Sequence, residues 1–334
     1  MSLGSGTSKP KLACEIAADR VIAGRLADKG GHLEACATRE LAPGAVVPDL
    51  LENNLRQRDA VRAGIEAALS GVAGRSRDVI AVVPDAAVRV VLVEFDTLPS
   101  DTEEAIGVVR FRLKKSLPFD VEKAKVSYHA QKFADGVRVV AAVALASVME
   151  DYEAAFNQAG FTPGVVLPSM LAALGAAQGV RPTLIVKVDA HTTSIAILSD
   201  GQLQLFRTLE NMRGITITGE QLAEEVYPSV VFFQDTYHLN IEQIYVAGVP
   251  ESGSLAVALQ AQTGAEVQEL VASSLMGASA SGSCSERSTG CSTSSPSLRV
   301  AAARSSRSSR RSPSSSSTTC RSRRCWLSSS SMRS

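Results

Sequence analysis

The chain has 334 residues, a length that suggests about two domains of roughly 150 residues each. It has 34 basic and 34 acidic residues, but residues 279–334 hold ten of the arginines and a single acidic residue, so the first 278 residues carry 24 basic and 33 acidic ones. No apolar run approaches the roughly 18 residues that a membrane-spanning helix needs. Only Cys14 and Cys36 precede residue 279, and they form no CxxC zinc motif. Composition therefore excludes a membrane-spanning helix and such a zinc site.

Residues 279–334 differ in kind from the rest, because 24 of these 56 residues are serine. Such a composition cannot build a core. One interpretation is a frameshifted segment, since GC-rich coding sequence read out of frame tends to give Arg, Ser and Cys without Lys. The other is a natural, disordered Arg/Ser-rich arm. Trp326 is its only aromatic residue, so the segment lacks the interleaved aromatics that stack on bases, and no nucleic-acid partner is expected.

The first part of the chain predicts an α/β unit. Residues 1–10 have no apolar signal core and are interpreted as a flexible leader. Strand-like runs separated by polar or glycine turns follow, then a helical pattern and a buried strand. The expected strands are 11–16, 21–27, 32–41 and 78–83, and the expected helix is 59–69. We assign 11–87 to a first lobe.

A different order of elements fills residues 88–160. A strand is followed by an amphipathic helix over 101–116, which should stop at Leu117-Pro118-Phe119 because proline disfavours helix in the residue before it. Residues 124–133 and 137–146 predict a hairpin around Asp135-Gly136, and a helix follows. This pattern indicates a small inserted subdomain, which serves either as a structural cap or as a surface for a partner.

After a return segment, 161–182, the pattern of the first lobe occurs again in residues 183–278. The expected strands are 183–188, 193–198, 202–209 and 243–247, with a helix over 218–237. Two copies of strand, strand, strand, helix, strand predict two similar α/β lobes that face each other. A ligand would lie in the crevice between them.

The turn between the first two strands of this second copy carries polar chemistry. It places Asp189 beside His191, Thr192 and Thr193. Turns of this kind can aim backbone N–H groups at a phosphate, and a nearby aspartate can orient a hydrated divalent cation. The alternative is a solvent-facing hairpin turn with ordinary Asp and Thr turn chemistry.

No catalytic residue is expected in this chain. The four histidines form no metal-binding spacing, and the sequence has no GxSxG elbow, P-loop or GxGxxG fingerprint. A sugar kinase would need a catalytic aspartate in a glycine-rich loop, and no such loop occurs. The chain is therefore expected not to be an enzyme.

Three stretches resemble the type IV pilus assembly protein family PilM, a relative of the cell-division protein FtsA within the actin, sugar kinase and heat-shock chaperone superfamily. Leu98-Pro99, Glu103-Glu104 and KKSLPFDVEKAKVSYHA resemble the inserted subdomain of that family. IVKVDAHTTSIAILSDGQL resembles its second phosphate hairpin, and IYVAGVPESGSLAVALQAQTG its adenosine-side turn. The resemblance implies a two-lobed, actin-like fold, a ribonuclease H-like unit in duplicate, with an FtsA-like insertion.

The resemblance also implies a function. Members of the family lie in the cytoplasm, peripheral to the inner membrane, where they bind the cytoplasmic N-terminal peptide of PilN and connect the pilus platform to its motor ATPases. Membrane association is then expected only through partners. ATP with Mg²⁺ is the cofactor that the resemblance implies. The alternatives are an actin-like ATPase or sugar-kinase-type phosphotransferase, and the cytoplasmic domain of a type II secretion platform protein.

The nucleotide residues depart from the family pattern. Ala17, Ala18 and Asp19 stand where the first phosphate hairpin has glycine and serine, and the lysine of that hairpin is missing. Asp189, the expected metal residue, is kept, with His191 in place of a glycine and Thr192 and Thr193 beside it. Gly248 and Val249 form the expected adenosine-side turn. These losses favour a scaffold over an ATPase, with Leu117 and Phe119 expected in the wall of its partner-binding groove.

Overall fold

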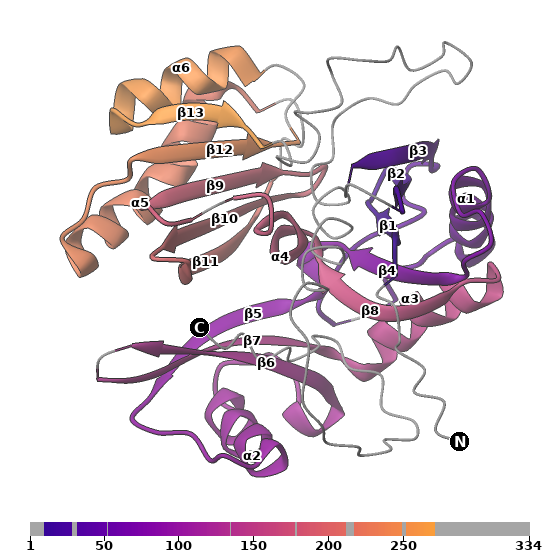
Figure 1. Cartoon of the computed structure of the whole chain (residues 1–334), viewed down its shortest axis with the longest axis horizontal. Coiled ribbons are helices and arrows are strands. Elements are labelled where there is room, and N and C mark those ends of the chain that lie inside the picture. Colours follow the sequence, from indigo (N-terminus) through magenta and orange to yellow (C-terminus); the bar gives the residue numbers. More distant parts are fainter. Residues whose placement is uncertain are drawn as a thin grey trace.

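The computed structural model describes residues 10–28, 32–51, 53–133, 135–177, 179–211, 217–248 and 252–270. Residues 1–9 of the expected leader and the whole Ser/Arg-rich segment 279–334 lie outside the described residues. The described chain forms an α/β structure with two five-stranded sheets and one three-stranded sheet (Figure 1). None of its described helices combines the length and the apolarity needed to cross a bilayer.

The first lobe is built on a sheet with the order β3-β2-β1-β4-β8. Its strands are β1 (Leu12–Ile16), β2 (Arg20–Leu26), β3 (Leu33–Glu40), β4 (Asp78–Val83) and β8 (Thr162–Pro168). β1 pairs antiparallel with β2 and parallel with β4. The central strand β1 is buried along its whole length, because helices α1 (Arg58–Ser70) and α3 (Ala146–Gln158) pack over the sheet and α4 (Ser169–Ala173) follows β8.

The second lobe repeats this topology, with the order β11-β10-β9-β12-β13. Its strands are β9 (Thr183–Val188), β10 (Thr192–Ser199), β11 (Gln202–Glu210), β12 (Gln243–Ala247) and β13 (Glu266–Glu269). Its helices are α5 (Gly219–Tyr237), whose N-terminus is closed by a capping box of Thr218 and Gln221, and α6 (Ser252–Thr263). The repeated order expected from the sequence is confirmed, with strand ends within one residue of those predicted.

The inserted unit has a three-stranded antiparallel sheet of order β5-β7-β6. Its elements are β5 (Arg89–Phe95), α2 (Thr102–Leu113), β6 (Ala124–Phe133) and β7 (Gly136–Leu145), with short 3₁₀ helices η1 (Asp85–Ala87) before it and η2 (Val121–Lys123) within it. Asp101 caps α2 by accepting hydrogen bonds from the two following glutamate amides, and α2 packs on one face of the sheet through Val109 and Leu113. α2 ends at Leu113, three residues before the predicted end. α3 follows β7 and packs chiefly on α1 of the first lobe.

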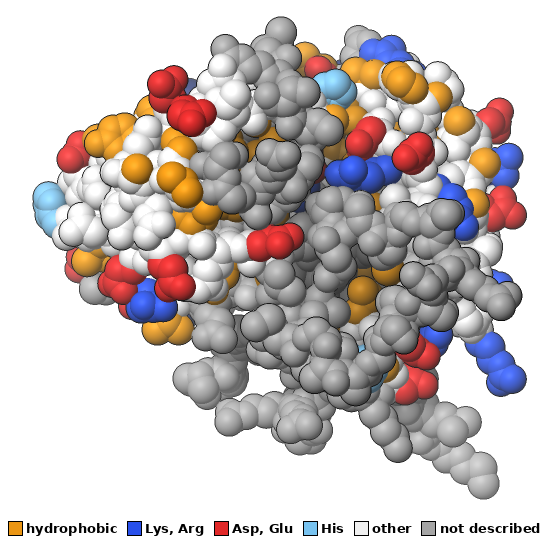
Figure 2. Space-filling view, turned by 90° about the horizontal axis from the view of Figure 1, so that it is seen from above, with side chains coloured by type: hydrophobic (Ala, Val, Ile, Leu, Met, Phe, Trp, Pro, Cys, Tyr) orange, Lys and Arg blue, Asp and Glu red, His pale blue; other side chains and the backbone are white. Residues whose placement is uncertain are grey.

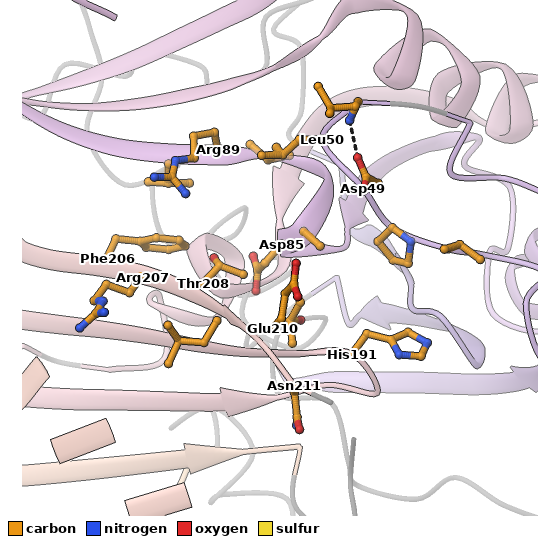
Figure 3. A pocket seen from close by; sticks show the side chains of 18 of the residues that line it. Asp49, Leu50, Asp85, Arg89, His191, Phe206, Arg207, Thr208, Glu210 and Asn211 are labelled. Carbon is orange, nitrogen blue, oxygen red and sulfur yellow. Dashed lines mark hydrogen bonds between the residues drawn. The ribbon is translucent and has the colours of Figure 1, made fainter. Parts of the chain in front are cut away.

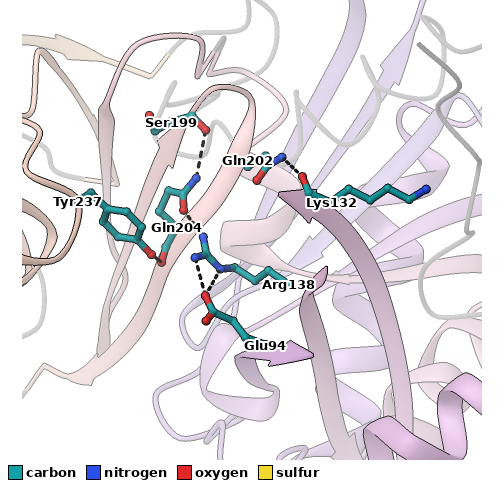
Figure 4. Close-up of polar contacts among 7 residues, drawn as sticks. All are labelled: Glu94, Lys132, Arg138, Ser199, Gln202, Gln204 and Tyr237. Carbon is teal, nitrogen blue, oxygen red and sulfur yellow. Dashed lines mark hydrogen bonds and ion pairs between the residues drawn. The ribbon is translucent and has the colours of Figure 1, made fainter. Parts of the chain in front are cut away.

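Polar contacts join the inserted unit to the second lobe (Figure 4). Arg138 on β7 donates to Glu94 on β5 at 2.6 and 3.0 Å, and it also donates to Gln204 on β11. Gln202 donates from Nε2 to the carbonyl oxygen of Lys132 at 2.8 Å. The second lobe therefore contacts the inserted unit directly through these side chains.

Candidate functional site

Three charged side chains, Glu15, Lys187 and Asp189, pair between the two lobes, and the buried Asp85 bridges the lobes through hydrogen bonds of its own. Glu15 lies in β1 and Lys187 in β9, the equivalent central strands of the two sheets. Asp85 follows β4, and Asp189 follows β9. These positions lie at the carboxyl ends of parallel-paired strands, which is where open α/β sheets place their ligands. The candidate site therefore consists of these four residues, called the charged cluster below, and the groove beside them.

Lys187 is the centre of the cluster. Its ammonium group donates to a carboxylate oxygen of Asp189 and lies 3.6 Å from Oε1 of Glu15. The side chains of Lys187 and Glu15 are only 1% and 3% exposed. Burial lowers the pKa of an ammonium group, but the carboxylates of Asp189, Glu15 and Asp85 outweigh burial and raise the pKa of Lys187 above its ordinary value. Lys187 therefore stays charged at physiological pH.

Asp85 has a hydrogen-bond donor for each of its oxygens. Oδ1 accepts from the backbone N–H of Met170 at 2.8 Å, and Oδ2 accepts from the hydroxyl of Ser194 at 2.8 Å. Burial raises the pKa of Asp85 to about 6, although Lys187 and these two hydrogen bonds act to lower it. Because Met170 belongs to the first lobe and Ser194 to the second, Asp85 links the lobes directly.

The pKa of Asp85 predicts a pH effect on stability. The folded protein binds this proton more tightly than the unfolded chain, whose carboxyl has the ordinary pKa of 3.8, so ionisation of Asp85 lowers stability as pH rises from about 4 to about 6. Asp85→Asn keeps the shape of the side chain and does not titrate. We expect the free energy of unfolding of the variant, relative to the wild type, to rise by about 2 kcal/mol between pH 4 and pH 7. Urea unfolding at both pH values measures this, and equal differences at the two would contradict it.

The residues of the expected first phosphate hairpin form a closed turn between β1 and β2. The N–H of Ala17 donates to the carbonyl oxygen of Arg20 at 2.8 Å, so this amide is used by the hairpin itself. The carbonyl oxygen of Asp19 accepts from Leu41 at 2.8 Å, and the carboxylate of Asp19 lies 3.5 Å from Arg20. Ala18 is half-buried between them. Where a phosphate would bind, the turn thus carries the negative side chain of Asp19, and the N–H of Ala17 is already used in a hydrogen bond.

The expected second phosphate hairpin is the turn between β9 and β10. Its closing hydrogen bond runs from the N–H of Asp189 to the carbonyl oxygen of Thr192 at 2.8 Å. His191 is exposed, whereas Thr192 and Thr193 are buried in β10. Thr193 is fully buried, and its hydroxyl has no partner among the described residues. Its side chain therefore lies inside the lobe, away from any ligand in the crevice.

Gly248, expected at the adenosine-side turn, has a structural reason to be glycine. Its φ is +80°, and a Cβ atom built there would lie 2.0 Å from the carbonyl oxygen of Val188. Only glycine allows the chain after β12 to approach the end of β9 so closely. The expected neighbour Val249 lies outside the described residues.

A groove of about 1000 Å³ lies beside the cluster, where the first lobe, the inserted unit and the second lobe meet (Figure 3). Asp49 and Leu50 lie on one side and the strand carrying Phe206 and Glu210 on the other, with Asp85 between them. The groove is lined by residues 47–51, Asp85, Ala86, Val88, Arg89, Val90, Pro118, 190–192 and 206–211. Its lining mixes apolar and charged side chains, a composition suited to an extended peptide.

The expected wall residues Leu117 and Phe119 are half-buried against the apolar core of the inserted unit. Their neighbour Pro118 is exposed and lines the groove. Of these three residues, only Pro118 lines the groove, whereas Leu117 and Phe119 pack into the inserted unit.

The cofactor implied by the resemblance, ATP with Mg²⁺, can be tested against these residues. Mg²⁺ demands oxygen ligands at about 2.0–2.1 Å in octahedral geometry and retains several waters. Asp189, the expected metal residue, already accepts from the ammonium group of Lys187, which carries a positive charge into the space that the ion would need. The residues present do not fit magnesium.

Two signals in the sequence point to this cluster, although no motif captures them. Lys187 is the only charged residue in the buried strand TLIVKV, and Glu15 is the only one in LACEI. A charged residue within a fully buried strand needs a partner, because an unpaired charge is costly to bury. Neither Asp85 nor Ser194 could have been paired with them from the sequence, since their contacts join segments about 100 residues apart.

The two lobes share one topology, and the small unit is inserted after β4 of the first lobe. This arrangement is that of an actin-like fold. No family model and no curated protein matches the sequence. Among solved structures, the chain is similar to a PilM–PilN type IV pilus biogenesis complex, with a TM-score of 0.68, 19% identity, and coverage of 80% of this chain and 90% of the other. The actin-like fold expected from the PilM resemblance is confirmed by this likeness.

Two further solved structures are similar at lower scores. The cytoplasmic domain of EpsL from the type II secretion system of Vibrio cholerae has a TM-score of 0.47 and 13% identity, covering 72% of this chain and 83% of that one. A protein of Bacteroides thetaiotaomicron described as having an actin-like ATPase fold and unknown function has a TM-score of 0.48 and 12% identity, covering 80% and 93%.

Proposed function

We propose that this chain is a non-catalytic scaffold of a type IV pilus platform that binds the cytoplasmic N-terminal peptide of a PilN-type membrane protein. The groove beside residues 47–51 carries the proposal, because it is large enough for an extended peptide and offers half-exposed apolar side chains. Val47 and Leu51 are 40% and 49% exposed there. The fold shared with the PilM–PilN complex supports the identity of the partner.

The charge of the second lobe supports a peptide of this kind. Residues 183–270 contain eleven acidic and three basic residues. Acidic side chains accordingly outnumber basic ones on the second-lobe side of the view from above (Figure 2). Cytoplasmic segments next to membrane spans carry an excess of Lys and Arg. An acidic lobe beside the groove would attract such a peptide and would repel nucleic acid.

In this role the protein would lie in the cytoplasm at the inner membrane, held there by its partner. It would connect the membrane component to the pilus motor ATPases indirectly, without turnover of its own. The absence of a phosphate-gripping hairpin at Ala17 to Asp19 supports a scaffold over an actin-like ATPase, since phosphoryl transfer depends on positioning and neutralising the phosphates.

A groove variant tests the proposal. We expect Leu51→Asp to weaken binding of a fluorescent PilN N-terminal peptide about tenfold or more, because it puts a charge on an apolar contact at the groove. Val257→Asp is the matched control: Val257 is 68% exposed on α6 and does not line the groove, so its affinity should equal that of the wild type. Fluorescence anisotropy at low and moderate salt measures both. Equal affinities for the two variants, or no binding by the folded wild type, would contradict the proposal.

A further inference from the structure

The outer face of helix α2 in the inserted unit carries apolar side chains in solvent. Phe111 is 81% exposed, the largest fraction for any large apolar side chain among the described residues. Val108 is 38% exposed and lies three residues earlier, so the two share one face of the helix. Val108 and Phe111 are called the α2 ridge below.

The α2 ridge points away from both lobes. α2 packs through Val109 and Leu113 on one face of the inserted sheet. The opposite face of that sheet, with Val140 and Ala142 of β7, belongs to the apolar core that it shares with the lobes. α2 is therefore the outermost layer of the inserted unit, and its outer side is the convex surface of a helix (Figure 1).

Basic side chains follow the α2 ridge at the C-terminal end of the helix. Residues 105–125 contain six basic and two acidic residues, in contrast to the acidic excess of the first 278 residues as a whole. Arg112, Lys114 and Lys115 are exposed, and none of them pairs with a carboxylate among the described residues. The acidic residues of α2 lie in its first turn, at the opposite end. The C-terminal end of α2 thus offers positive charge to an anionic partner.

An exposed aromatic ring beside unpaired lysines is typical of a helix that lies on a membrane surface. Such a helix buries its apolar side chains at the boundary between headgroups and acyl chains. Lysine and arginine near an anionic leaflet add to the binding, and their long stems reach the headgroups. A peptide partner would need a groove, whereas the α2 ridge is convex. The shape and the charge together favour a lipid surface.

The basic end of α2 also lies beside the groove. Pro118 lines the groove and follows Lys115 by three residues, which the chain spans in at most about 11 Å. A membrane protein whose cytoplasmic end is bound in the groove would bring the bilayer close to this end of α2. The second lobe, with eleven acidic and three basic residues over 183–270, would be repelled by the same anionic surface. The distribution of charge therefore orients the molecule with α2 toward the bilayer.

We propose that the α2 ridge, together with Arg112, Lys114 and Lys115, docks on the surface of an anionic phospholipid bilayer. The inference rests on the proposed location at a membrane, and it adds a direct lipid contact to the contact made through the partner peptide. Two apolar side chains insert little area, so the lipid contact is weak by itself. Its role is to orient a protein that the peptide already holds at the membrane.

A tryptophan placed in the α2 ridge of the full-length chain tests the contact. Trp326 is the only tryptophan of the chain, so Phe111→Trp combined with Trp326→Phe reports on the α2 ridge alone, whatever residues 279–334 bind. Vesicles of phosphatidylglycerol and phosphatidylethanolamine with brominated acyl chains should shift its emission to shorter wavelength and quench it about twofold. Vesicles of phosphatidylcholine should do neither. Val257→Trp with Trp326→Phe is the matched control, because Val257 is 68% exposed on α6 of the acidic lobe, and its emission should not change.

A charge reversal tests the lysines in the Phe111→Trp, Trp326→Phe background. Lys114→Glu combined with Lys115→Glu should lower the quenching about threefold or more, because two attractive charges become repulsive. Phe111, Lys114 and Lys115 are exposed, so these substitutions remove no packing, and circular dichroism checks the fold.

Four results would overturn the proposal. The first is no quenching at position 111 by the anionic vesicles, and the second is quenching that the charge reversal leaves unchanged. The third is equal quenching at positions 111 and 257. The fourth is a blue shift without vesicles, either one that grows with protein concentration, which would assign the α2 ridge to a second copy of the chain, or one produced by soluble polyglutamate, which would assign it to an acidic protein. The peptide-binding assay contains no vesicles, so failure of the lipid contact and failure of the proposed function are read separately.

Discussion

Gly248→Ala is expected to lower the free energy of unfolding by about 4 kcal/mol or more. The added methyl group would lie 2.0 Å from the carbonyl oxygen of Val188, a backbone atom that cannot turn away. The contact can be relieved only by moving the chain after β12 away from the end of β9, and these two strands pair along five residues. Such a shift would open the centre of the second lobe. Urea unfolding followed by circular dichroism measures the loss.

Gly44→Ala is the control for this prediction. Gly44 has φ of +74°, close to that of Gly248, but a Cβ atom there would meet no atom within 4 Å. Its substitution should therefore cost only the backbone strain of a left-handed alanine, about 1 kcal/mol. The difference between the two variants isolates the steric contact with Val188. Equal losses would show that the close approach at Gly248 does not exist in solution.

Lys187→Met is expected to cost about 3–5 kcal/mol of stability. Methionine fills a similar volume but leaves buried Glu15 and half-buried Asp189 without their cation. Breaking a buried ion pair from one side is costly, because the remaining charge keeps its desolvation penalty. Urea unfolding at neutral pH measures the loss.

A double variant separates charge from packing at this site. Glu15→Gln removes one of the stranded carboxylates, so Lys187→Met combined with Glu15→Gln should be less destabilised than the sum of the two single variants. Additive losses would mean that Lys187 stabilises the protein by packing rather than by pairing with Glu15. Lys125→Met removes a half-exposed lysine whose ion pair among the described residues is with one buried carboxylate, that of Glu153, so it should lose less than Lys187→Met.

The repeated order of elements could be predicted because each lobe contains the same local signals. Continuous apolar runs such as DVIAVV and TLIVKV are typical of buried parallel strands, and their helices show a clear helical period. β8 was not predicted, since its sequence TPGVVLP contains two prolines and a glycine. It lies at the edge of its sheet, where proline is tolerated because one side of the strand needs no ladder hydrogen bonds.

The candidate site could be predicted only in part. Asp189 was expected in the crevice from the turn that contains it, and the structure pairs it with Lys187, which also pairs with Glu15 of the first lobe. The pairing of Asp189 with Lys187 could not be predicted from the neighbouring sequence. Lys187 and Asp189 look like ordinary residues at a strand end until the fold brings Glu15 of the first lobe against Lys187. Successive side chains along β10 point to opposite faces of the sheet, but the sequence does not show which face Thr193 occupies. Every residue of β10 is buried, so the burial of Thr193 follows from the packing of the whole lobe.

We propose that the groove at residues 47–51 and 206–211 holds a PilN-type peptide, and photo-crosslinking tests this most directly. A synthetic PilN N-terminal peptide with a benzoyl-phenylalanine at an apolar position would be photo-crosslinked to the folded full-length protein, and the adducts would be mapped by mass spectrometry. We predict adducts on residues 47–51 and 206–211, and their loss in Leu51→Asp. Adducts confined to α6 around Val257, or an unchanged pattern in Leu51→Asp, would contradict the account.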